Sequence, residues 1–66
     1  MKARELLEIL NAAGCQARQA KGAHIVVECG KCRTVVSYHQ GKDIATGTLR
    51  AIERQLEPCL GKGWLK

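Results

Sequence analysis

The sequence predicts an α+β fold with the element order α-β-β-β-α, in which two helices cover one face of a three-stranded antiparallel sheet. Three observations support this prediction: helical spacing of apolar residues over positions 3–13, two runs of β-branched residues within 24–38, and a second helical pattern after Thr46. Two amphipathic helices can cover only one face of such a sheet, so the other face is predicted to be open to solvent or to a partner. We expect a single domain over residues 1–66.

The first helix is predicted from Ala3 to Ala13. Its apolar residues recur at the i, i+3, i+4, i+7 spacing of one helical face, namely Ala3, Leu6, Leu7 and Leu10. Gly14 then supplies a stop signal. Residues 15–20 form a weaker, polar strand candidate that ends at a turn at Lys21-Gly22.

Two stronger strand candidates, 24–29 and 32–38, flank Gly30-Lys31, where glycine in the first loop position favours a two-residue type II′ hairpin. This turn fixes the register, which pairs Cys29 with Cys32, Glu28 with Arg33, Val26 with Val35 and His24 with Ser37. Because side chains alternate along a strand, the bulkier ones lie on the face opposite to His24, namely Ile25, Val27, Val36 and Tyr38. His24 is therefore predicted to lie on the open face.

The second helix follows the loop 39–45, and Thr46 is predicted to be its N-cap. The apolar side of this helix consists of Leu49, Ile52 and Leu56. Pro58 is expected to limit its far end.

The chain is small and basic, with 66 residues, a net charge of +5 and a pI near 9.3. A domain of this size buries only about 60% of its unfolded surface, so a partner chain or a homo-oligomer would supply stability. The charge favours nucleic acid as a partner and equally fits a well-solvated surface. No signal peptide is apparent, and the longest apolar run, residues 25–27, is too short to span a membrane, so we expect a cytoplasmic protein.

The four cysteines are expected to stay reduced in the cytoplasm, which makes a disulfide framework their less favoured use. Cys29 and Cys32 have the spacing of half a zinc site, but Cys15 and Cys59 are predicted at unrelated corners of the fold. A thioredoxin-type redox pair would stand at a helix N-terminus rather than beside a β-turn. We therefore predict that Cys29 and Cys32 close the core as small apolar residues, and we predict no metal and no cofactor.

His24 is the leading candidate for chemistry, although a single histidine early in a strand is more often structural. Lys21 and Gly22 precede it, so a cation and a backbone that a ligand can approach closely lie beside an imidazole suited to acid and base work. By the hairpin register His39 lies two residues beyond Ser37, within diagonal reach of His24. His39 is therefore a second acid or base candidate.

A phosphate site is suggested by Lys42 together with the helix start, where free N–H groups and the helix dipole favour an anion at Thr46, Gly47 and Thr48. An ordinary capped helix explains the same pattern. Arg50 and Arg54, four residues apart, form either a phosphate-binding stripe or a solvated face. The chain has one Tyr, one Trp and no Phe, so recognition of RNA would rest on backbone and shape rather than on base stacking.

The sequence resembles the HicA family of bacterial mRNA-interferase toxins over nearly the whole chain, from the first helix to about Leu56. The resemblance is carried by the Gly-x-His at 22–24 and by a downstream run of His39, Gly41, Lys42, Asp43, Ile44, Gly47, Thr48, Leu49 and Arg50. Ala23 stands where the family often has Ser, and Ser37-Tyr38 replaces a Pro-containing pair. The tail at 57–66 has no clear counterpart in the family.

The resemblance implies a fold like that of double-stranded-RNA-binding domains, whose element order is also α-β-β-β-α. It implies the toxin of a type II toxin–antitoxin system: a metal-independent endoribonuclease that cleaves mRNA and is held inactive by a HicB-type antitoxin. The family's catalytic histidine falls on His24, and we expect the cations and helix start named above, Lys21 included, to bind the RNA. The alternative is a catalytically silent RNA-binding or protein-binding module of the same fold.

Overall fold

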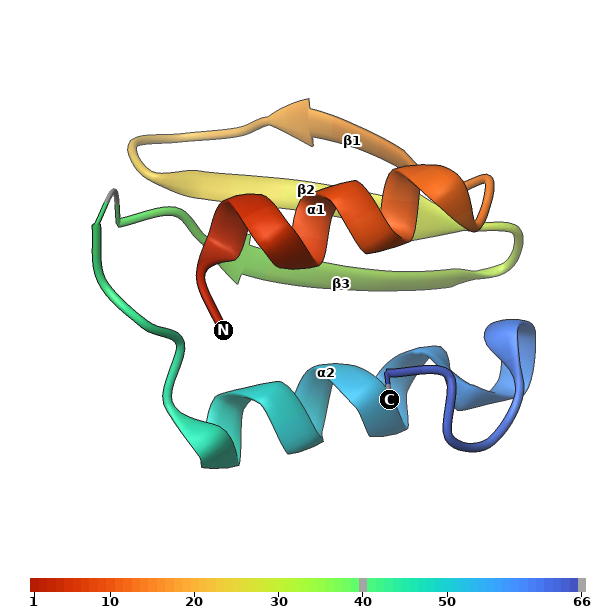
Figure 1. Cartoon of the computed structure of the whole chain (residues 1–66). Helices are drawn as coiled ribbons and strands as arrows, with labels where there is room; N and C mark the ends of the chain where they lie inside the picture. Colours follow the sequence, from red (N-terminus) through yellow and green to blue (C-terminus); the bar gives the residue numbers. More distant parts are fainter. Residues whose placement is uncertain (40, 66) are drawn as a thin grey trace.

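The helices and strands follow one another in the predicted order. The computed structural model describes residues 1–39 and 41–65, so Gln40 of the loop and Lys66 of the tail lie outside the described residues. The elements are α1 (Ala3–Ala12), β1 (Gln16–Gln19), β2 (His24–Cys29), β3 (Cys32–Ser37) and α2 (Thr46–Leu60). Figure 1 shows α1 lying along the sheet and α2 running beside β3. The α-β-β-β-α prediction is confirmed.

The sheet is antiparallel throughout, with the strand order β1-β2-β3. The register of β2 with β3 is the predicted one, including the pairs His24 with Ser37 and Cys29 with Cys32. Gly30 has a φ of 62°, the left-handed conformation that the first position of a type II′ turn requires. The weak strand prediction at 15–20 is also confirmed, because β1 pairs with β2 over its whole length.

The core lies on one face of the sheet only. Val27 and Val36 point toward the helices and are fully buried, whereas Val35, on the other face, is 49% exposed. Both helices contribute buried leucine or isoleucine side chains to this core: Leu6 and Leu10 from α1, Ile52 and Leu56 from α2. The predicted open face is therefore present, and it carries His24, Val26, Glu28, Arg33, Val35 and Ser37.

The far end of α2 differs from the prediction. The helix continues through Pro58 to Leu60, although a proline inside a helix removes one backbone hydrogen bond and costs roughly 3 kcal/mol. A disulfide, a hydrogen bond and the packing of Leu60, Trp64 and Leu65 against the core hold this last part of the chain. Cys59 is bonded to Cys32, and the Trp64 indole N–H donates to the backbone carbonyl of Glu53 at 2.9 Å. Long-range contacts thus override the local stop signal.

The cysteines also differ from the prediction, because all four form disulfides. Cys15 is bonded to Cys29 and Cys32 to Cys59, with Cα–Cα distances of 4.4 and 6.1 Å. The bonds link residues 14 and 27 positions apart. Loops of such lengths stabilise a fold by about 3 to 3.5 kcal/mol each in the chain-entropy account. These cross-links give a small domain part of the stability that its core alone supplies poorly.

The predicted placement of Cys15 and Cys59 at unrelated corners is wrong. The β1–β2 register pairs Gln16 with Glu28, so the preceding Cys15 falls opposite Cys29. The continuation of α2 past Pro58 returns Cys59 to the same end of the sheet. Cys29 does close the core, as predicted, since only 4% of its surface is exposed.

Matched substitutions on the two faces of the sheet test the one-sided core. Val27→Ala and Val35→Ala remove the same two methyl groups from a buried and an exposed position. We expect Val27→Ala to lower the free energy of unfolding by about 2 kcal/mol, because it loses burial and leaves a cavity. Val35→Ala should cost less than about 1 kcal/mol. Urea titration with both disulfides intact measures the two values, and equal losses would contradict the one-sided core.

Candidate functional site

His24 begins β2 at the edge of a tight connection from β1. The backbone N–H of Ala20 donates to the His24 carbonyl at 2.8 Å, and the His24 N–H donates to the Lys21 carbonyl at 3.2 Å. Gly22 has a φ of 64°, which only glycine adopts without strain. The short connection therefore fixes where His24 enters the sheet. Its side chain is exposed on the open face, opposite Ser37, as predicted.

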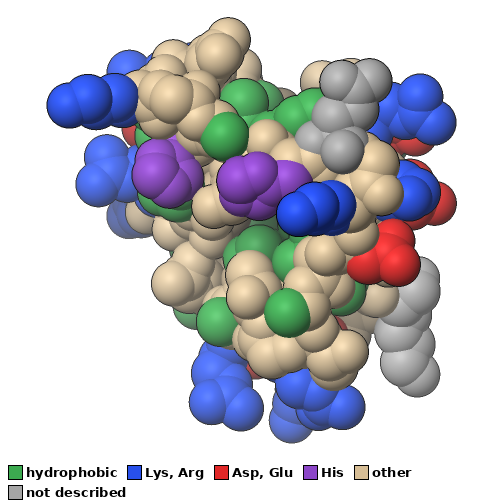
Figure 2. Space-filling model, turned by 90° about the vertical axis from the view of Figure 1, so that its left-hand side faces the viewer, with side chains coloured by type: hydrophobic (Ala, Val, Ile, Leu, Met, Phe, Trp, Pro, Cys, Tyr) green, Lys and Arg blue, Asp and Glu red, His purple; other side chains and the backbone are tan. Residues whose placement is uncertain are grey.

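His39 leaves the same end of the sheet just after β3. The backbone N–H of Tyr38 donates to the Ala23 carbonyl at 2.7 Å, which continues the β2–β3 alignment beyond the last strand residue. His39 therefore emerges close to the residue that precedes His24. Figure 2 shows both histidines on the surface of this end of the molecule, with Lys and Arg side chains on either side of them.

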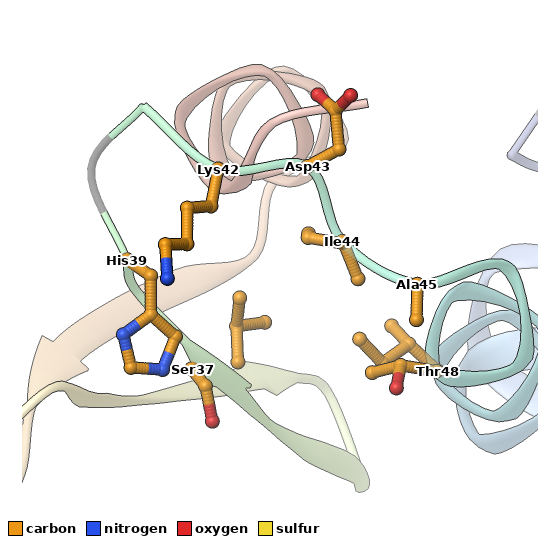
Figure 3. Close-up of a pocket in the computed structure, with 9 residues that line it drawn as sticks. Ser37, His39, Lys42, Asp43, Ile44, Ala45 and Thr48 are labelled. Atoms are coloured by element: carbon orange, nitrogen blue, oxygen red, sulfur yellow. The ribbon is translucent and has the colours of Figure 1, made fainter.

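A pocket of about 210 Å³ opens between the end of β3, the following loop and the start of α2. Its polar lining residues are Ser37, His39, Lys42, Asp43 and Thr48, and its apolar ones are Val36, Ile44, Ala45 and Ile52. Figure 3 shows the Lys42 side chain extending toward the His39 imidazole, whereas the Asp43 carboxylate points away from both. The pocket thus presents an ammonium group and an imidazole on one side, with the nearest carboxylate turned away.

Asp43 lines the pocket, but its carboxylate contacts the residues that precede α1 and so ties the loop to the start of that helix. Its carboxylate lies 3.8 Å from the Lys2 ammonium group, and that ammonium group also donates to the Gly41 carbonyl at 3.2 Å. The Ile44 N–H donates to the Met1 carbonyl at 2.8 Å. These contacts position the segment that carries Lys42. Asp43 therefore has a structural role within the run from His39 to Arg50 that carries the family resemblance.

The start of α2 differs from the prediction in its capping residue. Ala45, in an extended conformation, is the N-cap, so the prediction of Thr46 in this position is wrong by one residue. The first intrahelical bond runs from the Leu49 N–H to the Ala45 carbonyl at 3.0 Å. The N–H groups of the three preceding residues, 46–48, have no acceptor within the helix. Alanine has no side-chain acceptor to cap them, which leaves them available to an external anion.

The predicted site residues are only partly brought together. His39, Lys42 and Thr48 line one pocket, and His24 connects to it through its partner Ser37, which lines the same pocket. Lys21 is exposed beside His24 at this end of the sheet. Arg50 and Arg54 are exposed further along α2, and neither lines this pocket.

Six pocket residues were not among the predicted site residues: Val36, Ser37, Asp43, Ile44, Ala45 and Ile52. The hairpin register already pairs Ser37 with His24, so that register was a signal for its inclusion. The roles of Ile44 and Ala45 depend on the path of the loop between β3 and α2, which no local pattern defines.

Neither helix in the described part of the chain is long and apolar enough to cross a membrane.

A comparison with known protein families gives one match. A family model described as "HicA toxin of bacterial toxin-antitoxin" matches residues 3–57. The match includes both histidines, the loop and the start of α2, and it ends before Cys59 and the tail. No curated protein and no solved structure gives a significant match. Because the family model covers most of its length, the chain belongs to the HicA family of toxins of bacterial toxin–antitoxin systems.

Proposed function

We propose that the protein is a metal-independent endoribonuclease that cleaves mRNA, with His24 as its general base. The observation that carries the proposal is the exposure of His24 opposite Ser37, which lines the same pocket as His39 and Lys42. The exposed His24 imidazole lies on the open face of the sheet, where RNA can reach it. Lys21, in the connection before β2, and Lys42, in the loop after β3, supply the nearby cations. Membership in the HicA family supports the same assignment.

RNA carries its own nucleophile, so the protein needs to supply little more than proton transfer and charge stabilisation. In the proposed reaction His24 removes the proton of a 2′-hydroxyl, whose oxygen attacks the adjacent phosphorus. The bond from phosphorus to the 5′-oxygen breaks, and His39 donates a proton to that leaving oxygen. The products are a 2′,3′-cyclic phosphate and a free 5′-hydroxyl, and they leave His24 protonated and His39 deprotonated.

Cations and backbone N–H groups around the two histidines would stabilise the negative charge of the reacting phosphate. Lys21 lies three residues before His24, and the Lys42 ammonium group extends toward His39 (Figure 3). The uncapped start of α2 offers N–H groups to a neighbouring phosphate, and Thr48 joins that helix start to the pocket. Arg50 and Arg54 lie outside the pocket and would contact the RNA backbone further along the RNA chain.

The biological setting follows from family membership. We propose that the toxin acts on mRNA in the cytoplasm and arrests translation until a HicB-type antitoxin binds it. With few aromatic residues in the chain, the RNA would be held through its phosphates and its shape. The net charge of +5 favours such backbone contacts.

Replacement of the general base tests the assignment directly. His24→Ala should reduce the rate of RNA cleavage by at least about 100-fold, because general-base catalysis contributes 10² to 10⁴. The exposed position of His24 predicts an unchanged far-UV circular dichroism spectrum and melting temperature. Cleavage is measured in EDTA with antitoxin-free protein, and the 3′ ends of the products are analysed for cyclic phosphate.

His39→Ala is the matched comparison. It also removes one imidazole, but that of the proposed acid instead of the proposed base. It should slow cleavage of a normal RNA, and a substrate with a better leaving group at the 5′-oxygen should restore the rate for this variant only. Undiminished cleavage by His24→Ala would rule out the base assignment. RNA binding without products in the unsubstituted protein would instead favour a catalytically silent RNA-binding module.

The salt dependence of RNA binding tests the role of Lys42. Each phosphate neutralised by a lysine adds about 0.7 to the slope of log affinity against log salt for single-stranded nucleic acid. We expect Lys42→Gln to weaken binding and to lower this slope by about that amount. Lys62→Gln removes the same charge from the exposed tail and should leave the slope unchanged. Equal slopes for both variants would exclude a phosphate contact by Lys42.

A further inference from the structure

The four cysteines of the chain gather at the end of the sheet opposite the histidines. Three of them are neighbours across the sheet. Cys29 pairs with Cys32 in the hairpin, and the β1–β2 register places Cys15 on the other side of Cys29. Cys59 reaches the same place from the last turn of α2 and is bonded to Cys32. A pocket of about 180 Å³ is lined by Cys15, Cys29 and Cys59 together with Gly30.

We propose that the reduced chain binds one Zn²⁺ ion through the thiolates of Cys15, Cys29, Cys32 and Cys59. Four thiolates in tetrahedral arrangement are a common structural zinc site, and a Cys-x-x-C pair is a typical half of one. Here Cys29 and Cys32 supply that half on a β-hairpin, and Cys15 and Cys59 supply the other ligands from two different elements. The ion would link β2 and β3 to both the start of β1 and the end of α2.

The backbone distances suit such a site. A Zn–S distance near 2.3 Å in a tetrahedron places the sulfur atoms about 3.8 Å apart. The Cα–Cα distances are 4.4 Å for Cys15 and Cys29 and 6.1 Å for Cys32 and Cys59, and cross-strand partners such as Cys29 and Cys32 lie about 5 Å apart. These three pairs can therefore each place their two sulfur atoms at the spacing that a shared Zn²⁺ requires once the disulfides are open.

The disulfide form and the zinc form exclude each other. With the sulfur atoms paired, no group of three or more His, Cys, Asp or Glu residues within positions 1–39 and 41–65 is arranged to hold a metal. Reduction requires four electrons and four protons, which two molecules of a dithiol supply as each closes to its own disulfide. The four thiols then release four protons as their thiolates bind Zn²⁺.

The redox compartment favours the zinc form. In the cytoplasm, where we place the proposed ribonuclease, thiols are kept reduced and clustered cysteines more often bind metal than form disulfides. The site lies about 17 Å from His24 along β2, since Cys29 is five residue steps beyond His24 in an extended strand. Cys59 also lies outside the part of the chain that matches the HicA family. The preference for the zinc form rests on the cytoplasmic location in the proposed function, but the zinc ligands lie apart from the proposed nuclease site.

Metal titration of the reduced, full-length protein tests the proposal. The chain is reduced with a dithiol, separated from it without oxygen and titrated with Zn²⁺ alone. We expect one Zn²⁺ per chain and a rise in melting temperature over the metal-free reduced chain. Titration with Co²⁺ should give the intense visible bands of a tetrahedral thiolate complex, and one equivalent of Zn²⁺ should displace them.

Single substitutions separate a four-cysteine site from simpler ones. Cys15→Ser and Cys59→Ser should each weaken zinc binding by more than about 100-fold, since loss of a ligand should exceed the 10- to 100-fold cost of losing an outer-shell partner. His24→Ala keeps all four cysteines and should bind zinc normally, which excludes an imidazole ligand. Failure of the reduced unsubstituted chain to bind stoichiometric zinc would overturn the proposal. Full affinity in Cys59→Ser would do the same, whatever the stability of that variant.

Discussion

The register of β2 against β3 is the constraint on which the rest of the structure depends. The Gly30-Lys31 turn pairs Val27 with Thr34 and Val26 with Val35, which assigns every side chain of the hairpin to a face. A shift of one residue would turn the buried Val27 outward and His24 into the core. Because both helices pack on the Val27 face, the same register that builds the core also keeps an imidazole exposed on the opposite face.

Much of the fold could be predicted from the sequence because its determinants are local. Glycine at position 30 defines the hairpin turn, and the spacing of Leu6 and Leu10 defines the buried side of α1. The end of α2 could not be predicted in this way, because the contacts that carry the helix past Pro58 come from residues distant in sequence. Length matching offers a partial signal. Fifteen helical residues span about 22 Å and six strand residues about 20 Å, so a helix that starts near the histidines ends near the hairpin tip.

The geometry of the candidate site could be predicted from the sequence only in part. His39, Lys42 and Thr48 do line one pocket, because the backbone of Tyr38 stays aligned with β2 and the loop then turns toward α2. Arg54 carries the same charge as Lys42, but its position two turns into α2 takes it away from that pocket. Residue type alone could not separate these two cations. Their separation depends on the loop path, which is fixed partly by the contact of Asp43 with Lys2 at the start of α1.

The two ends of the sheet differ in how strongly they are held, and this difference suits the proposed function. At the hairpin tip, Cys29 and Cys32 are each tied by a disulfide to another part of the chain, Cys15 at the start of β1 and Cys59 in α2. At the other end the loop is held by backbone hydrogen bonds and by the exposed pair of Lys2 and Asp43, and exposed pairs contribute less than about 1 kcal/mol. Local opening should therefore cost far less at the loop than at the tip. In the proposed function, the loop can therefore adjust to an RNA bound against His24 and the pocket, whereas the cross-linked tip maintains the register that keeps His24 exposed.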